Sequence, residues 1–343
     1  MPDFSPTAIK KRATHGAFLK RQFFAEPPKL TPQDVDLSGK TAIITGSNTG
    51  IGFESCKQLI ELNLSKLIIA VRSVSKGQEA KERILKEKGK TKCEIEVKKL
   101  DLSSYDSIIE FVEYTKTLDR VDIVINNAAV NKRNFVLDPA TGHEETIQVN
   151  YLGNALFALL ILPVMQAKNT PESPGCLSFV NSETGSWAKF KEQTSTPILP
   201  AFDNQASFDF QDRYPTSKLL GQLFLKELVK RVPDSTVIVN CSNPGLCKTS
   251  LAREFTGLLG IAAFILHALV ARTAEVGGRA ITDAAVNHGK ESHGEYIEDG
   301  EVVPSAPFIY TDQGKKVAEQ LWQETLDELA FAGVKDILSN LGK

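Results

Sequence analysis

Tyr214 and Lys218 are the residues of this sequence best suited to proton transfer. They open an amphipathic helical pattern in which Pro215 suits the first helical position, and a spacing of four places both side chains on one helix face. Tyrosine ionises near pH 10, so proton exchange at neutral pH requires a pKa lower by about 3 units, or roughly 4 kcal/mol. A lysine cation about 4 Å away, at an effective dielectric constant near 20, supplies an energy of that size. The alternative is a tyrosine packed on the core beside a solvated lysine.

Ser182 supplies a hydroxyl group directly after the apolar run that ends in Phe179, Val180 and Asn181. Such a hydroxyl can bind a carbonyl substrate and hold it against Tyr214. Neither a GxSxG turn nor a serine–histidine–acid signature accompanies Ser182, so acyl transfer through a serine nucleophile is disfavoured. The competing structural role is a turn or helix cap.

A glycine-containing turn, Thr45-Gly46-Ser47-Asn48-Thr49-Gly50-Ile51-Gly52, follows an apolar run and leads into a helical pattern. Its first two glycines free the backbone for a close ligand, and its third lets helix and strand pack together. The amides at the helix N-terminus then suit a pyrophosphate, although a tight turn without a ligand is the alternative. The candidate cofactor contacts in this turn are Gly46, Asn48, Thr49, Gly50, Ile51 and Gly52.

Two polar side chains follow the next apolar runs and suit the adenosine half of a dinucleotide. Arg72 stands where an acid would bind the ribose diol of NAD and where an arginine binds the 2′-phosphate of NADP. We therefore predict NADP(H), with a solvated surface arginine as the alternative. Asp101, followed by Leu102, is placed to accept a hydrogen bond from the adenine amino group, or to cap the next helix with Ser103.

The elements that must position these residues alternate between short runs rich in β-branched residues and amphipathic segments. This pattern predicts an α/β fold, a doubly wound parallel sheet of the Rossmann type in a single domain. The predicted strands are 41–45, 66–71, 94–100, 121–126, 177–181 and, last, 294–297. The predicted helices begin near residues 50, 75, 103, 143 and 214, and a final helix runs from about 311 to 332.

The fourth predicted strand ends in Asn126-Asn127-Ala128-Ala129. Amide side chains there can tie neighbouring strands together, and the small alanines admit the cofactor ribose closely. A merely polar strand end is the alternative. The glycine turn, Asp101 and this segment occur in the order, and at the strand ends, where open α/β sheets bind ligands.

Taken together, these motifs make the sequence resemble the short-chain dehydrogenase/reductase family over roughly residues 38–300. Residues 45–52 match its TGxxxGxG turn, 126–129 its NNAG motif with alanine as the last residue, and 214–218 its YxxxK motif. Asn150 matches the helix asparagine that holds a water in the family's proton relay, and 243–249 match its Pro-Gly segment at the nicotinamide end. The resemblance thus implies further cofactor contacts at Asn127, Ala128, Pro244, Gly245, Leu246 and Thr249.

The sequence looks most like the retinol-dehydrogenase-like branch, which includes fungal secondary-metabolite enzymes and usually uses NADP(H). The resemblance implies interconversion of a ketone or aldehyde and an alcohol. Ser182 and Tyr214 would bind the substrate oxygen, Tyr214 would donate the proton, Lys218 would hold the nicotinamide ribose and stabilise the phenolate, and Asn150 would relay a proton. A retinoid or steroid dehydrogenase, an enzyme of dehydration or epimerisation and a non-catalytic dinucleotide-binding scaffold are the rivals.

Two segments near the site carry many apolar residues and suggest a hydrophobic substrate of polyketide, steroid or retinoid type. Ser182 and Tyr214 lie 32 positions apart, a longer gap than in most relatives, and we interpret 187–213 as an inserted loop over the substrate mouth. An inert surface excursion is the alternative. The segment 250–272 contains an apolar run, 258–270, too short to span a bilayer; we expect a lid, with a membrane-dipping segment as the alternative.

The ends of the chain extend beyond the predicted domain of residues 38–310. Residues 1–37 mix lysine and arginine with phenylalanine, and we predict a leader helix packed on the domain rather than one lying on an anionic membrane. Residues 311–343 are predicted to form a C-terminal helix.

Composition limits the classes of partner. The 343 residues are 42% hydrophobic and 24% charged with a net charge of −2, so nucleic acid is not expected as a partner. The five cysteines show no CxxC spacing and the N-terminus shows no secretory signal, which together favour reduced thiols in a cytoplasmic protein. We expect no metal site; a homodimer and peripheral membrane contact stay open.

Overall fold

The computed structural model describes residues 3–89, 91–249, 251 and 270–341. Within these residues the sheet has eight strands in the order β3-β2-β1-β4-β5-β6-β7-β8, and only the pair β7 and β8 is antiparallel. The predicted doubly wound Rossmann-type fold is confirmed. The strands are β1 Thr41–Thr45, β2 Lys66–Val71, β3 Glu94–Lys99, β4 Ile123–Asn126, β5 Gly175–Val180, β6 Val237–Asn243, β7 Tyr296–Glu298 and β8 Glu301–Val303.

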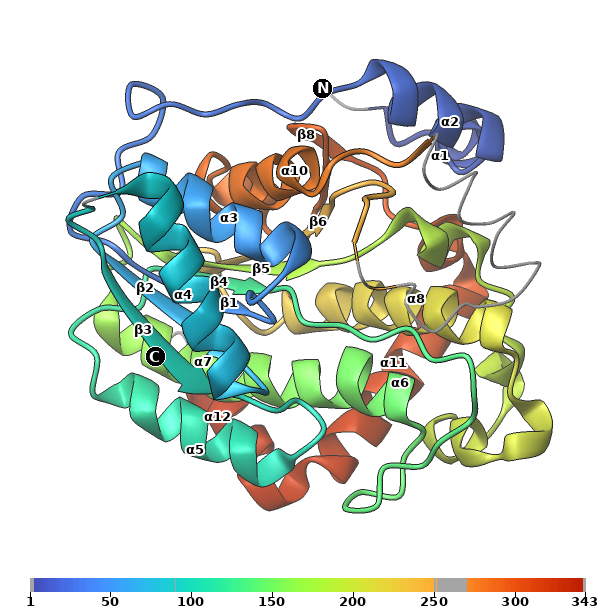
Figure 1. The fold of residues 1–343 in the computed structure, drawn as a ribbon. Helices are drawn as coiled ribbons and strands as arrows, with labels where there is room; N and C mark the ends of the chain where they lie inside the picture. The colour runs from blue at the N-terminus through green and yellow to red at the C-terminus, as the bar shows by residue number, and fades with distance from the viewer. Residues whose placement is uncertain (1–2, 90, 250, 252–269, 342–343) are drawn as a thin grey trace.

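Helices cover both faces of this sheet (Figure 1), with α3, α4 and α10 on one face and α5, α7, α8, α11 and α12 on the other. In the described parts of the chain, the helices after β1 are α3 Gly50–Glu61, α4 Val74–Lys88, α5 Tyr105–Lys116, α6 Glu145–Ile147, α7 Asn154–Lys168, α8 Phe210–Leu228, α10 Ala274–Val286, α11 Asp312–Glu328 and α12 Val334–Asn340. Two further helices, α1 Pro6–Arg12 and α2 His15–Phe24, precede the sheet.

Alternation along the strands explains why both faces are buried. In β1, Ile43 belongs to the core under α5, α7 and α8, whereas Ala42 and Ile44 belong to the core under α3 and α10. Successive side chains of a strand point to opposite faces, so a continuous apolar strand needs a cover on each side. The order of strand addition reverses between β1 and β4, and open α/β sheets have their ligand-binding crevice above the carboxyl ends of the strands at such a point.

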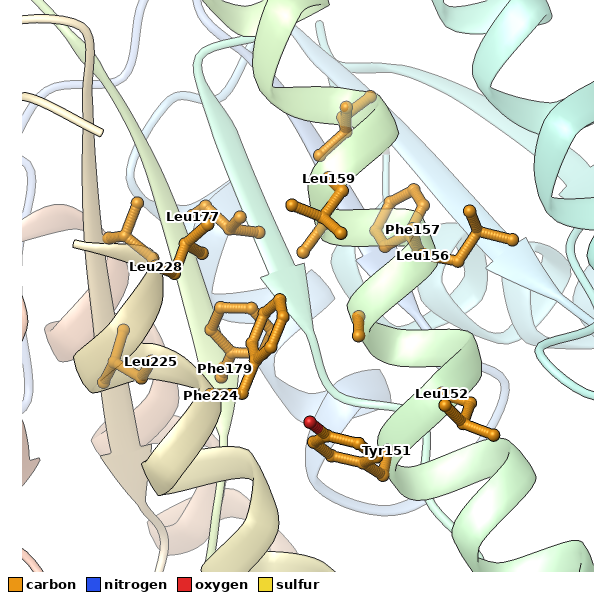
Figure 2. Close-up of a cluster of buried hydrophobic side chains, with 14 of the residues drawn as sticks. Tyr151, Leu152, Leu156, Phe157, Leu159, Leu177, Phe179, Phe224, Leu225 and Leu228 are labelled. Atoms are coloured by element: carbon orange, nitrogen blue, oxygen red, sulfur yellow. The ribbon is translucent and has the colours of Figure 1, made fainter. Parts of the chain in front are cut away.

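The larger core lies between α7 and α8 over β5 (Figure 2). Leu159 of α7 points toward Leu177 of the strand, and Phe179 of the strand makes an edge contact with Phe224 of α8, with ring centroids 6.2 Å apart. The stretch Glu145–Lys168 is the one part of the described chain long and apolar enough to cross a membrane, and 89% of its apolar window is buried inside the protein. Its hydropathy is therefore that of a core helix.

Several predicted boundaries are wrong for local reasons. The helix of Tyr214 begins at Phe210, where Asp209 caps it, so Pro215 lies inside the helix instead of at its first position. The strand β6 was absent from the predicted set, and the last strand is β8 because the chain forms a hairpin after β7. The predicted final helix is two helices, because the chain between α11 and α12 turns at Gly333, whose φ is +67°.

The inserted segment 187–213 is packed into the protein through short 3₁₀ helices. Phe190 and Phe202 are almost fully buried, and their rings stack with centroids 6.1 Å apart. The backbone amides of Ile198 and Leu199 donate to the carboxylate of Glu324 in α11. These contacts argue against an inert surface excursion. The proposed lid, 250–272, falls mostly outside the described residues.

Candidate functional site

The glycine turn has the geometry needed for close backbone approach. Gly46 and Gly50 both have a φ of +64°, and a Cβ atom on Gly46 would lie 2.9 Å from Cα of Ala128. A Cβ atom on Gly52 would lie 2.6 Å from Nδ2 of Asn127. Side chains at these positions would push the turn away from the end of β4.

The N-terminus of α3 faces the same crevice and suits an anion. Thr49 is its N-cap residue but accepts no hydrogen bond through its side chain, and the first turn of α3 carries no acid. Unpaired amides and the positive end of the helix dipole are the features that bind phosphate groups at such turns. Within the described chain, the turn containing Asn48 and Ile51 therefore fits a dinucleotide pyrophosphate.

The asparagines at the end of β4 tie two strands together, as expected from their type. Asn127 donates through Nδ2 to the carbonyl oxygen of Thr45 at 2.7 Å, and the hydroxyl of Thr45 accepts from the amides of Asn127 and Ala128 at 2.9 Å. Asn126 accepts from the same hydroxyl at 3.3 Å. This network fixes the spacing between the ends of β1 and β4.

Arg72 and Asp101 lie where the sequence places them, at the carboxyl ends of β2 and β3. Arg72 follows β2 directly and its side chain is exposed at that edge of the sheet. Asp101 accepts hydrogen bonds from the amide and the hydroxyl of Ser103 at 3.1 and 2.8 Å, which is a local turn. The N-cap residue of α5 is Ser104, so the alternative in which Asp101 and Ser103 cap this helix is wrong. Leu102 is buried. The adenine contact of Asp101 stays a prediction.

Tyr214, Ser182 and Lys218 come together, although they arise from α8 and from the end of β5. The Tyr214 hydroxyl forms a hydrogen bond with Ser182, and the ammonium of Lys218 lies 5.5 Å from the centre of the Tyr214 ring. Nζ of Lys218 donates to the carbonyl oxygen of Val180 at 3.0 Å. A phenol and a hydroxyl, both half-buried, thus lie beside a buried cation.

Burial governs the ionisation of both members of the YxxxK pair. It raises the pKa of Tyr214 above the ordinary value, and the hydrogen bond with Ser182 offsets only part of this effect. Burial also lowers the pKa of Lys218 to about 8. Removal from water disfavours the charged form of each group. The expectation that Lys218 lowers the pKa of Tyr214 was based on spacing alone and left out this effect of burial.

Asn150 lies in a π-helical turn, Gln148–Gly153, that interrupts the helix between α6 and α7. Its carboxamide pairs with the backbone of Val130, accepting from the amide and donating to the carbonyl, both at 2.8 Å. It also donates to the hydroxyl of Ser217 at 3.0 Å, next to Lys218. Single π-turns are frequent at functional sites, and here one directs Asn150 toward α8.

The Pro-Gly segment after β6 returns to the glycine turn. Gly245 has a φ of +73°, and the Thr249 side chain approaches Gly50, where an added Cβ atom would lie 3.4 Å from its Cγ2. Pro244 is buried and Leu246 is half-buried beside it. The predicted nicotinamide-end and phosphate-end contacts therefore meet at one crevice.

Two side chains that the sequence did not single out position the reactive residues. Asn181 donates to the carbonyl oxygen of Lys218 at 3.0 Å and accepts from the amide of Ser182 at 2.8 Å. Gln222, one turn beyond Lys218, donates to Asn181 at 2.9 Å. The available signals were that Asn181 is adjacent to Ser182 and that Gln222 lies four residues after Lys218, on the same helix face.

Comparison with known proteins agrees with this geometry. Residues 40–191 match the family model for short chain dehydrogenase. The chain is 44% identical over 347 aligned residues to the short-chain dehydrogenase fogG of Aspergillus ruber, covering 99% of each chain. The chain belongs to the short-chain dehydrogenase/reductase family. It is an oxidoreductase with an NAD(P)-binding Rossmann fold.

One further relative and one solved structure extend this comparison. The short chain dehydrogenase/reductase mfmJ of Annulohypoxylon moriforme is 43% identical over 326 residues, with 94% of each chain covered. The crystal structure of L-sorbose reductase from Gluconobacter frateurii, complexed with NADPH and L-sorbose, has a TM-score of 0.58 at 19% identity. That alignment covers 79% of this chain and 99% of the reductase, which supports the shared fold.

Proposed function

We propose that this protein is an NADP(H)-dependent reductase that interconverts a ketone or aldehyde and an alcohol on a hydrophobic substrate. The observation that carries the proposal is the meeting of Tyr214, Ser182 and Lys218 at the carboxyl end of β5. A secondary-metabolite substrate of polyketide type fits the resemblance to fungal family members, and a cytoplasmic location fits the five buried, free cysteines, all of which lie in the described chain.

Bound NADPH would supply the hydride, held by the glycine turn, Arg72 and the Pro-Gly segment. Ser182 and Tyr214 bind the substrate oxygen, and the Tyr214 hydroxyl donates its proton to that oxygen as negative charge develops. Lys218 stabilises the resulting phenolate. In the proposed relay, Asn150, which is hydrogen-bonded to Ser217 beside Lys218, would hold the water that returns a proton.

A panel of hydrophobic ketones and alcohols, incubated with the purified protein and either nicotinamide cofactor, tests this function. We expect NADPH to be consumed in equal amount to the alcohol formed. Turnover of substrate without net cofactor oxidation would instead identify dehydration or epimerisation. Tight NADPH binding with no turnover across the panel would support the scaffold.

Replacing Arg72 by aspartate is expected to reverse the cofactor preference. The substitution removes a charge-assisted contact to the 2′-phosphate of about 1.5–3 kcal/mol, so KM for NADPH should rise about 10- to 100-fold. KM for NADH should fall, because aspartate can accept hydrogen bonds from the ribose diol. Steady-state kinetics with both cofactors give the two KM values.

The matched control is Lys86→Asp, the same charge reversal on the exposed face of α4. This variant should keep the wild-type ratio of KM values for the two cofactors. An Arg72→Asp enzyme with that same ratio would show that Arg72 does not contact the phosphate.

A further inference from the structure

Gln22 of α2 connects the N-terminal extension, residues 3–37, to the Pro-Gly segment, residues 243–249. Its Nε2 donates to the carbonyl oxygens of Leu246 and Val270 at 2.8 and 3.0 Å, and its Oε1 accepts from the amide of Leu246 at 3.1 Å. Gln22 is buried, with 6% of its surface exposed. A Cβ atom on Gly245 would lie 2.9 Å from its Oε1, so the carboxamide packs directly on this turn.

Arg272 fastens the same segment to the end of α2. Its backbone pairs with Leu246 and Lys248 at 2.8 Å, and its Nη2 donates to the carbonyl oxygens of Arg21 and Ala25 at 3.0 and 2.8 Å. A cation at these carbonyls satisfies the C-terminal end of a helix and its dipole. Leu246 is thus hydrogen-bonded both to Gln22 of α2 and to Arg272, which itself donates to the end of α2.

A buried charge network reaches from the extension to the reactive serine. Arg21 pairs with Glu183, the residue after Ser182, and with Glu298 at 3.0 Å, while Arg12 of α1 also pairs with Glu298. The side chains of Glu183 and Glu298 are 8% and 5% exposed. Buried carboxylates need such cations, since an unpaired buried charge is strongly unfavourable.

The network then returns to the Pro-Gly segment. Asn243 donates through Nδ2 to Glu298 at 2.8 Å and accepts from the amide of Gly245 at 3.1 Å. On the other side, Nε1 of Trp187 donates to the carbonyl oxygen of Ala13 at 2.7 Å, and its ring stacks on His15 at 4.4 Å. The extension therefore contacts both the Pro-Gly segment and the segment after Ser182.

We propose that α1 and α2 are a positioning element of the reaction site. Through Gln22 and Arg21, they hold the Pro-Gly segment and the segment after Ser182 at the separation in which nicotinamide and substrate meet. Gln22 is a positioning residue that acts through Leu246. The inference rests on the proposed function for the identity of the nucleotide, and it goes beyond a packed leader helix because it assigns the extension a role in binding.

The test compares two nucleotides on the full-length protein by fluorescence titration and by isothermal titration calorimetry. NADPH occupies the whole crevice, whereas 2′-phospho-ADP-ribose lacks the nicotinamide. In Gln22→Leu, the dissociation constant for NADPH should rise about tenfold, while that for 2′-phospho-ADP-ribose should stay within twofold of wild type. KM for NADPH should rise in parallel.

The matched control is Gln58→Leu. Gln58 is a half-buried glutamine of α3 that donates to the carbonyl oxygen of Glu275 at 2.9 Å and accepts from the hydroxyl of Thr282 at 3.0 Å, two turns away from the glycine turn. The Gln58→Leu variant should bind both nucleotides with wild-type affinity. Should Gln22→Leu fold poorly, Gln22→Glu keeps an acceptor for Leu246 but loses both donated bonds, and it should show the same selective loss.

Equal changes in the affinities for the two nucleotides, or no change in either, would overturn the positioning role. A wild-type protein that binds neither nucleotide would instead refute the proposed function. A selective loss of NADPH affinity in the Gln22 variant that the Gln58 control does not share supports the inference.

Discussion

Tyr214→Phe is expected to reduce kcat for carbonyl reduction about 1,000-fold while leaving NADPH affinity within about twofold. Positioned general acids contribute 10²- to 10⁴-fold, and the phenylalanine ring fills the same buried space without a proton to donate. The substrate oxygen then keeps only one protein donor, the Ser182 hydroxyl, and the hydrogen bond between Tyr214 and Ser182 is lost as well. Steady-state kinetics and a fluorescence titration with NADPH separate the two effects.

Tyr114→Phe is the matched control for this experiment. Tyr114 of α5 carries the same phenol group, which donates a hydrogen bond to Glu96 of the edge strand β3 at 2.9 Å. Its variant should keep wild-type kcat. If Tyr214→Phe also retained kcat, tyrosine would have no role as the acid, and the proposed mechanism would have to change.

The residues of the glycine turn and of β1 and β2 could be predicted closely from the sequence. The strands Thr41–Thr45 and Lys66–Val71 have the predicted bounds because uninterrupted apolar runs flanked by polar residues have few alternatives in an α/β chain. The start of α3 at Gly50 follows from the same turn. Local patterns were sufficient wherever local contacts decide the structure.

Helix caps, hairpins and distant contacts were harder to predict. The strand β8 follows β7 in a hairpin, and Pro215 lies inside α8 because a cap at Asp209 starts the helix earlier. The hydrogen bonds of Gln22 with Leu246 join residues 224 positions apart, and no periodicity in the sequence points to them. Propensity gives no information about such tertiary contacts.

The electrostatics of the site were also predicted only in part. Spacing alone predicted that Lys218 would face Tyr214, and the ammonium does lie over the ring. The size of its influence could not be predicted, because burial depends on the whole fold and opposes charge on both groups. Asn181 and Gln222, which set the positions of Ser182 and Lys218, were not singled out although they lie next to Ser182 and four residues after Lys218.

Lys218→Met is expected to lower kcat at least about 100-fold and yet to raise the free energy of unfolding by about 1 kcal/mol at pH 7. Burial lowers the pKa of Lys218 from 10.5 to about 8, a cost of about 3 kcal/mol that an apolar side chain avoids. Loss of the hydrogen bond to Val180 takes back about 1–3 kcal/mol of this gain. A site that is stabilised by losing its cation keeps that cation for function.

The pH dependence of this difference identifies its cause. Below about pH 8, Lys218 is protonated in both the folded and unfolded states, so the folded protein bears the full cost of the buried cation. Between about pH 8 and 10.5, the unfolded chain binds more protons than the folded one, and the wild type gains stability relative to Lys218→Met. Urea unfolding at pH 7 and pH 10 should therefore show the stability advantage of the variant shrinking or reversing. The control Lys226→Met, which replaces a half-buried lysine two turns along α8, should keep wild-type kcat. A stability advantage of Lys218→Met that stays constant from pH 7 to pH 10 would show that Lys218 is not a destabilising buried cation.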